Sequence, residues 1–253
     1  MRPLDPQSCR ALADALGDTP ETVIPVHLLR RGLCRTYLAG ELSRFASAIV
    51  QDRAFPTEPT AFGSDPEALW ELLRRVEGWD CVNVSAEVAE PLAEIMAAEM
   101  GRSVRHYGDV YHTMPAPAPT VANTAVRRLT LADLELLESA PADVGGVGFG
   151  GGRALLSDGV VACGIVDGKI VAIAQTYALT ERHVDIGVST LEPWRKRGFA
   201  TAAASVVARR VQEGGRTPVW STGEDNYASL RVAEKLGFVE VGRRTYLIPG
   251  DGE

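Results

Sequence analysis

The second half of the chain is a regular succession of strand-like and helix-like segments. Short β-branched runs bounded by Gly and Asp predict strands, and apolar residues three or four positions apart predict helices. Asp167-Gly168 is a hairpin signal between two of these runs. The predicted order is β-α-β-β-β-α-β-α-β, with strands at Val126–Leu129, Val160–Val166, Ile170–Ala178, His183–Thr190, Pro218–Ser221 and Phe238–Ile248, and helices starting near Thr130, Gly198 and Tyr227.

The ends of these helices carry recognisable signals. Thr130 and Asp133 have the spacing of an N-terminal capping box. Asn226 is placed to cap the helix that starts at Tyr227, and Gly237 is placed for the left-handed residue that follows its last turn. The segments therefore predict a mixed α/β fold for this half.

The first half repeats part of the same order, β-β-β-α-β-α-β. Gly78–Met114 and Gly215–Ile248 each run strand, helix, Gly, strand at similar spacing, which indicates an internal duplication. The predicted strands and helices of this half are Thr36–Ala39, Ala46–Gln51, Thr60–Phe62, helix Pro66–Val76, Asp80–Val84, helix Glu90–Met100 and Tyr107–His112.

A proline-rich segment separates the two halves. Met114–Thr120 has proline at alternate positions, which excludes it from a helix or a central strand. We interpret it as a linker and place the domains at residues 1–120 and 121–253. A surface loop within one domain is the alternative interpretation.

Composition narrows the class of protein. The chain has 253 residues, of which 45% are hydrophobic and 23% charged, as in an ordinary globular protein. No apolar run is long enough for a membrane helix, and the N-terminus lacks the pattern of a secretory signal. Four scattered cysteines suggest neither disulfides nor a metal site. A net charge of −7 argues against nucleic-acid binding. We therefore expect a cytoplasmic protein without metal, membrane or nucleic-acid partners.

The segment Thr190–Thr201 carries the most specific chemistry. A strand ends, a basic loop containing Gly198 follows, and a helix begins at once. The first amides of a helix lack internal partners and its dipole favours anions, so such a site binds phosphate or pyrophosphate. A solvated basic turn is the simpler alternative. The glycine-rich segment Gly146–Gly151 also fits GxGxxG, but no buried strand precedes it, and we expect only a loop there.

At these residues the chain resembles the GNAT superfamily of acyl-CoA-dependent N-acyltransferases. Arg195-Lys-Arg-Gly198-Phe-Ala200 matches the family signature Arg/Gln-x-x-Gly-x-Gly/Ala, and Asn226-Tyr-Ala-Ser229 followed by Leu236-Gly237-Phe238 matches a second element at the right distance. The resemblance covers roughly residues 124–250. It implies a complete GNAT fold in the C-terminal domain and a degenerate GNAT-like repeat in the N-terminal one.

The resemblance also implies a site for acetyl-CoA as co-substrate. The backbone of Val188, Ser189 and Thr190 would pair with the pantetheine, and Asn226 and Ser229 would approach the pantetheine or the phosphates. Amides of the loop and first helical turn would hold the pyrophosphate, namely those of Arg195, Lys196, Arg197, Gly198, Phe199, Ala200 and Thr201. A primary amine of a small molecule or peptide would then attack the thioester directly.

The chain departs from the family pattern at the catalytic acid. The usual Tyr, five residues before the Phe of the Gly-Phe pair, is replaced by Ala233. For the general base we choose Asp185, on the strand before the motif. A solvated strand carboxylate is the alternative for Asp185, and a turn-end histidine is the alternative for the neighbouring His183.

Two other functions remain open. A non-catalytic acyl-CoA-binding sensor or regulatory module would explain the missing Tyr, and a nucleotide enzyme could use the same helix terminus.

The N-terminal half has Asp65 where a phosphate would bind. It would therefore serve as a scaffold, a homodimer surface or one wall of the acceptor cleft. The loop Pro141–Leu156 is expected to contribute to the acceptor site. Bacterial two-domain acetyltransferases resembling the zwittermicin-resistance type have this layout.

Overall fold

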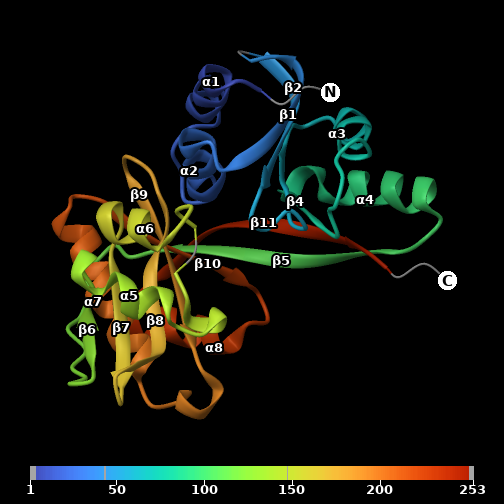
Figure 1. The fold of residues 1–253 in the computed structure, drawn as a ribbon. Helices are drawn as coiled ribbons and strands as arrows, with labels where there is room; N and C mark the ends of the chain where they lie inside the picture. Colours follow the sequence, from blue (N-terminus) through green and yellow to red (C-terminus); the bar gives the residue numbers. More distant parts are fainter. Residues whose placement is uncertain (1–3, 43, 147, 251–253) are drawn as a thin grey trace. The chain divides into compact units, whose positions relative to one another are not determined.

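The computed structural model describes residues 4–42, 44–146 and 148–250 (Figure 1). These residues divide into two compact units. Unit 1 consists of two segments, one that ends at Val110 and one that begins at Gly242. Unit 2 is the segment between them, Tyr111–Val241. The sequence places the boundary at 120/121 and gives the whole C-terminus to the second domain, so the observed division differs at both ends.

Unit 1 contains a mixed sheet and four helices among its described residues. Its hydrogen-bonded strand order is β1-β2-β3-β4-β11-β5. The elements are α1 (Pro6–Leu16), α2 (Val23–Arg31), β1 (Cys34–Glu41), β2 (Arg44–Asp52), β3 (Thr60–Phe62), α3 (Pro66–Leu73), β4 (Val82–Ser85), α4 (Ala86–Met100), β5 (Val104–Thr113) and the greater part of β11 (Val239–Pro249).

Helices α1 and α2 were missed by the sequence analysis, although α1 carries a clear start signal. Asp5 accepts hydrogen bonds from the amides of Gln7 and Ser8, and Pro6 occupies the first helical position. Leu12 and Ala13 face a core cluster shared with α2 and with strands β1 and β2.

Unit 2 has the strand order β10-β9-β8-β7-β6, and β10 has β5 as its other neighbour. The elements are β6 (Val126–Arg128), α5 (Leu134–Glu138), α6 (Gly152–Asp158), β7 (Val161–Val166), β8 (Lys169–Leu179), β9 (His183–Thr190), α7 (Phe199–Glu213), β10 (Thr217–Gly223) and α8 (Tyr227–Leu236), with short 3-10 turns at Leu131–Asp133, Ala142–Val144 and Glu192–Trp194. The mixed α/β fold predicted from the sequence is confirmed. Helix α6 was not predicted.

The two units repeat the same element order. The series β1-β2-β3-α3-β4-α4-β5 matches β7-β8-β9-α7-β10-α8-β11. Within each series the first three strands pair antiparallel and the third pairs parallel with the fourth. In unit 1, however, the strand beside β4 is β11, with Arg244–Leu247 opposite Val82–Ser85, and not β5. The last strand of the second repeat therefore completes the sheet of the first.

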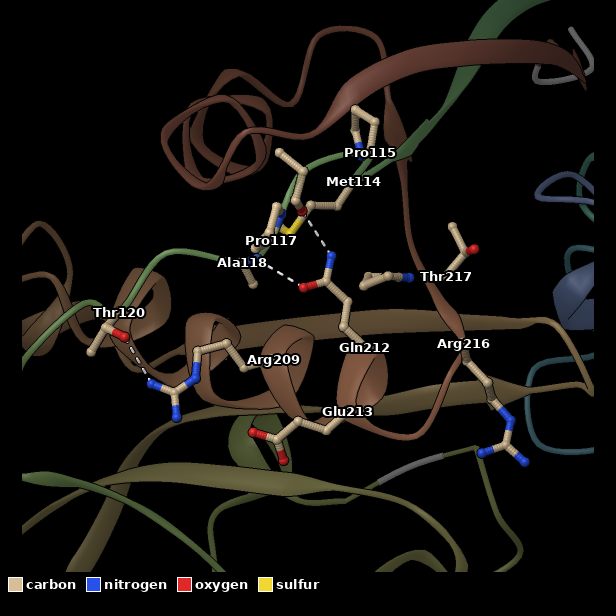
Figure 2. Close-up of a pocket in the computed structure, with 12 residues that line it drawn as sticks. Met114, Pro115, Pro117, Ala118, Thr120, Arg209, Gln212, Glu213, Arg216 and Thr217 are labelled. Atoms are coloured by element: carbon tan, nitrogen blue, oxygen red, sulfur yellow. Dashed lines mark hydrogen bonds between the residues drawn. The ribbon is translucent and has the colours of Figure 1, made fainter.

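The proline-rich segment is part of unit 2 and does not behave as a linker. The amide of Ala118 donates to Oε1 of Gln212 over 2.8 Å, and Nε2 of Gln212 donates to the carbonyl of Ala116 over 2.8 Å (Figure 2). Farther along α7, the Ser205 hydroxyl accepts from the Val121 amide. Side chains of α7 accept from the amides of Ala118 and Val121, and they donate to the carbonyls of Ala116 and Pro119. The segment is thus a strap bound along α7.

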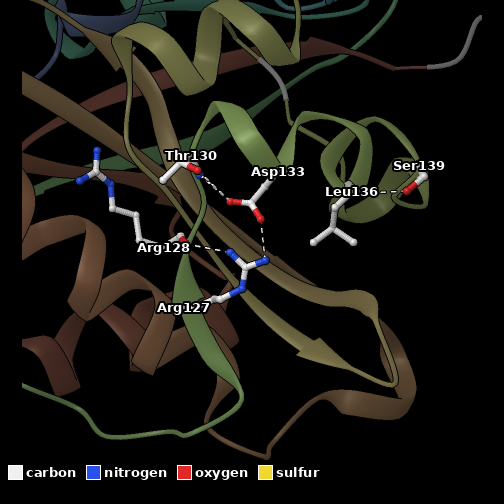
Figure 3. A network of polar contacts seen from close by, with 6 residues as sticks. All are labelled: Arg127, Arg128, Thr130, Asp133, Leu136 and Ser139. Atoms are coloured by element: carbon white, nitrogen blue, oxygen red, sulfur yellow. Dashed lines mark hydrogen bonds and ion pairs between the residues drawn. The ribbon is translucent and has the colours of Figure 1, made fainter.

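The predicted capping box is present and is extended by an ion pair. Asp133 accepts from both the amide and the hydroxyl of Thr130, and Arg127 donates to it over 2.6 Å (Figure 3). The hydrogen bond from Arg127 lowers the pKa of Asp133 to about 2. This network joins β6 to the turn that leads into α5.

No helix in the described ranges is long and apolar enough to cross a membrane.

Candidate functional site

The site begins where two parallel strands separate. In the described residues of unit 2, the ladder between β9 and β10 joins Thr217–Val219 to His183–Asp185 and ends there, although β9 continues to Thr190. The strand is buried up to Ile186 and becomes partly exposed from Gly187 onward. Val188, Ser189 and Thr190 keep their pairing with β8. Their opposite edge faces the opening between the strands, which we call the fork.

A basic loop with unusual backbone angles follows the fork. Lys196 and Gly198 both have positive φ, of 62° and 82°. Successive amides in such alternating conformations point toward one side and form an anion-binding concavity. Arg195 holds the loop to the strand, since its Nε donates to the carbonyl of Thr190 over 3.2 Å. Residues 195–198 are exposed.

Helix α7 starts at the end of this loop with its first amides available. Gly198 is the N-cap residue and provides no side-chain hydrogen bond. The 15-residue helix therefore presents its positive dipole end and its unbonded amides to the loop.

A tight contact sets the position of this helix end. A Cβ at Gly164 on β7 would lie 2.5 Å from the Phe199 ring, so the glycine makes room for the first residue of α7. The Trp194 ring meets Phe199 edge-on at 6.0 Å, and the Arg197 guanidinium lies 4.8 Å from the centre of the Trp194 ring. The Phe199 side chain is buried, so its predicted role at the site can be carried only by its backbone amide. No local pattern in the sequence singles out Gly164.

One buried polar atom at the fork has no partner. Within the described chain, Oγ1 of Thr190 is inaccessible to solvent and makes no hydrogen bond. A buried hydroxyl of this kind costs free energy unless a partner satisfies it. It lies at the end of β9, directly before the loop. The amides, the cations and this hydroxyl form a donor set that fits a phosphate-bearing ligand with a polar chain, as acetyl-CoA is.

Asn226 and Ser229 have structural partners at the start of α8. Oδ1 of Asn226 accepts from the Ser229 amide over 3.2 Å, which confirms the predicted N-cap. The Ser229 hydroxyl accepts from Nε1 of Trp220 over 2.9 Å, and Trp220 is buried against Phe238. Asn226 is exposed, and its side-chain NH2 group can still donate to a ligand.

Asp185 lies at the vertex of the fork. It pairs with Val219 in the last step of the ladder and is only 3% exposed, so the alternative of a solvated carboxylate is wrong. The hydroxyl of Ser221 donates to its Oδ1 over 3.0 Å. Ser221 is partly exposed and lies two residues beyond the ladder, on the separating part of β10. Sequence analysis missed Ser221, because nothing in the spacing of the two strands indicates their register.

His183 is the first residue of β9, at the end of the turn that leads into the strand. Its amide donates to the Thr180 hydroxyl over 3.1 Å, and its carbonyl accepts from the Thr180 amide over 2.9 Å. These bonds support the interpretation of His183 as a turn-end histidine.

The position of the missing tyrosine is inside the core. Ala233 is 1% exposed and packs with Leu236 and Phe238 in the cluster between α7 and the sheet. Tyr227 is 67% exposed at the start of α8. Tyr246 lies in unit 1, where burial raises the pKa of its phenol. The family position of the catalytic tyrosine thus carries no hydroxyl in this chain.

The GxGxxG segment serves packing. A Cβ at Gly148 would lie 2.3 Å from the Tyr177 carbonyl, and one at Gly146 would meet the Leu155 side chain at 2.6 Å. The glycines let this segment approach β8 and α6 closely, as expected for a loop. Residue 147 lies outside the described residues.

A separate open pocket of about 650 Å³ lies at the other end of α7 (Figure 2). The strap, Arg209 and Gln212 line it, together with the residues that lead into β10. Since a helix of this length spans about 22 Å, this pocket is distinct from the basic loop at Gly198. Within the described ranges no His, Cys, Asp and Glu side chains gather in a group suited to a metal ion.

Comparisons with known proteins agree with this geometry. Residues 150–247 match the family model for GNAT acetyltransferase. This range includes the fork, the basic loop and helices α7 and α8. No curated protein matches the sequence.

Solved structures match nearly the whole chain at low identity. A GCN5-related N-acetyltransferase-like protein from Streptococcus suis has a TM-score of 0.72 at 20% identity, covering 96% of this chain and 99% of its own. A GCN5-related N-acetyltransferase from Kribbella flavida has a TM-score of 0.66 at 17% identity, covering 96% of each chain. A tandem GNAT protein from the clavulanic acid biosynthesis pathway has a TM-score of 0.55 at 14% identity, covering 99% and 98%.

These structural likenesses establish the fold, and the tandem protein agrees with the two repeats seen here. The family model covers the segment that contains the proposed ligand site. Residues 150–247 therefore resemble the GNAT acetyltransferase family, whose members transfer acyl groups from acyl-CoA.

Proposed function

We propose that this protein is an acetyl-CoA-dependent N-acetyltransferase that acetylates a primary amine of a small molecule or peptide by direct attack. The observation that carries the proposal is the junction of two features. The strand edge at Val188–Thr190 opens away from β10, and the uncapped amino end of α7 begins directly after it. An extended acyl-pantetheine chain has the shape to lie along the strand edge, and the pyrophosphate at its end has the charge that suits the helix end.

The residues would divide the binding between them. Amides of 195–201 hold the pyrophosphate, with Arg195, Lys196 and Arg197 adding positive charge. The free edge of Val188–Thr190 pairs with the pantetheine amides as an added strand would. The Thr190 hydroxyl gains the partner that it lacks. Asn226 donates to the ligand from its side-chain NH2 group. Ser229 acts indirectly, because its hydrogen bond with Trp220 holds the amino end of α8 in place.

Asp185 would act as the general base. When bound, acetyl-CoA supplies the acetyl group as an activated thioester. An attacking amine must lose a proton, and a carboxylate at the vertex of the fork can accept it. Ser221 keeps the Asp185 carboxylate oriented through its hydrogen bond. Backbone amides beyond the ladder polarise the acetyl carbonyl.

The departing thiol does not require a strong acid. A thiol with a pKa near 8.5 leaves as a thiolate at modest cost near neutral pH. The buried Ala233 is therefore compatible with turnover. A Tyr at this position would have to fit into a filled core.

Calorimetric titration with acetyl-CoA tests the cofactor directly, with ATP and NAD as controls. We expect micromolar affinity for acetyl-CoA, about −8 kcal/mol, and no heat from the controls. Binding of ATP or NAD in place of acetyl-CoA would indicate a nucleotide enzyme.

Turnover separates an enzyme from a sensor. A panel of primary amines is incubated with acetyl-CoA, and the released thiol is measured. Asp185→Asn should bind acetyl-CoA normally and release thiol at least about 100-fold more slowly, the usual contribution of a general base. Asp167→Asn, at the exposed turn before β8, is the matched control. Tight acetyl-CoA binding without thiol release from any amine would favour the sensor.

A further inference from the structure

Unit 1 contains a second fork, at the place that corresponds to the one in unit 2. Strand β3 is the third of its series and β4 the fourth, as β9 and β10 are in the second repeat. Within the described part of unit 1, their parallel ladder has one step, between Thr60 and Asn83. Beyond this step, Ala61 and Phe62 remain paired with β2, and the described ladder with β4 does not continue.

The side chain of Arg244 fills this second fork. Its NH2 group donates to the carbonyl of Ala61 on β3 over 2.8 Å and to the carbonyl of Asn83 on β4 over 3.2 Å. Its Nε donates to the side chain of Asn83. The guanidinium lies 4.8 Å from the centre of the Phe62 ring. One planar cation thus bridges the carbonyls of both separating strands.

The charge of Arg244 is compensated inside the unit. Arg244 is 7% exposed, and a buried charge is costly unless it is hydrogen-bonded and balanced. Asn83 connects it to a carboxylate, because Nδ2 of Asn83 donates to Oδ2 of Asp109 over 2.9 Å. Asp109 is also buried. Arg244, Asn83 and Asp109 therefore form a continuous buried hydrogen-bond network within unit 1.

The helix next to this fork has no exposed anion seat. Asp65 caps α3 by accepting from the amides of Glu67 and Ala68 over 3.0 and 3.2 Å. In unit 2 the corresponding helix end is uncapped. The position where an anion would bind in unit 1 is thus taken by the chain's own carboxylate, as Asp65 suggested from the sequence.

We propose that Arg244 acts as an internal ligand that closes the fork of unit 1, so that the chain binds one acyl-CoA, in unit 2 only. The identity of the excluded ligand rests on the proposed function. The role of Arg244 in holding β3 and β4 together does not. Arg244 comes from β11, the strand that the second repeat contributes to the first. The strand that completes the sheet of unit 1 therefore also carries the side chain that closes its fork.

Two measurements on the full-length chain test this proposal. Arg244→Met keeps an unbranched stem but removes every donor, and Arg243→Met, at the exposed neighbouring position, is the matched control. We expect Arg244→Met to lower the thermal midpoint by about 5 °C relative to Arg243→Met, since it leaves the carbonyls of Ala61 and Asn83 and the side-chain oxygen of Asn83 without the guanidinium donor. Arg244→Lys should not restore the midpoint, because an ammonium cannot bridge both carbonyls in a plane.

Calorimetry gives the number of sites. We expect wild type and both Met variants to bind one acetyl-CoA per chain with the same affinity, because Asp65 still occupies the anion position of unit 1 when Arg244 is replaced. Two molecules per wild-type chain, or equal thermal midpoints for the two Met variants, would overturn the proposal. If the wild type bound no acetyl-CoA, the proposed function would fail, whereas the thermal comparison would still decide whether Arg244 holds the fork closed.

Discussion

The ring of Phe199 occupies the space that a side chain on Gly164 would need. A Cβ at this glycine would stand 2.5 Å from Cδ1 of Phe199. A larger residue at this position in the middle of β7 would therefore have to displace the first residue of α7. Since the amides at that helix end are the proposed pyrophosphate donors, a packing contact sets the geometry of the ligand site.

Gly164→Ala should displace the first turn of α7. We expect a loss of about 1–3 kcal/mol of stability from overpacking and an acetyl-CoA affinity lowered about tenfold or more. Gly152→Ala is the control, because its added Cβ would meet only ordinary contacts at 3.4 Å or beyond. Chemical denaturation and calorimetry measure the two effects. Equal acetyl-CoA affinities for both variants would contradict the positioning role of Phe199.

Arg195→Ala combined with Gly198→Asp should abolish acetyl-CoA binding in a folded protein. The change removes a charge-assisted hydrogen bond, a loss of about 1.5–3 kcal/mol, and places a negative charge at the pyrophosphate seat. The control is Arg182→Ala with Gly168→Asp, since Gly168 has a similar φ of 74° in an exposed turn. Unchanged affinity in the loop variant, measured by calorimetry, would contradict the site.

Acid should remove the stabilisation that Asp133 provides. Its pKa is lowered from 3.8 to about 2 by the hydrogen bond from Arg127, so the folded state favours the carboxylate. The contribution is complete above pH 3.8 and is lost as the pH falls toward 2. Arg127 is half exposed, which limits the effect to about 1 kcal/mol.

The measurement is urea denaturation of wild type and Asp133→Asn between pH 6 and pH 2. We expect wild type to be more stable at pH 6 and the difference to shrink below pH 4. Asp167→Asn makes the same chemical change at an exposed turn and should show no such trend. A difference independent of pH would assign the effect to capping geometry alone.

A fragment of residues 1–120 should not fold by itself. It lacks β11, which pairs with β4 and places Leu247 in the core of unit 1. Fusing residues 239–253 to the fragment through a flexible Gly/Ser linker should restore a cooperative thermal transition, followed by circular dichroism. A cooperative transition of equal midpoint in the unfused fragment would show that the first repeat is independent of β11.

The local pattern of the sequence determined most elements of the second half. The strands flanking Asp167-Gly168, the helix ends at Thr130, Asn226 and Gly237, and the basic loop before α7 all follow from interactions within a few residues. Short-range capping and turn chemistry do not depend on the rest of the fold. This is why the turn and helix start of the proposed ligand-binding segment could be predicted from the sequence.

Contacts between distant residues were decided only by the tertiary structure. The strap on α7, the hydrogen bond from Ser221 to Asp185, the room that Gly164 leaves for Phe199 and the position of Arg244 in the fork of unit 1 each join residues separated by many positions in the chain. Such contacts depend on strand order and register, and in this protein β11 pairs with β4 instead of leaving that place to β5. Local periodicity carries no information on which strand becomes the neighbour, because that choice is made by the packing of the whole sheet.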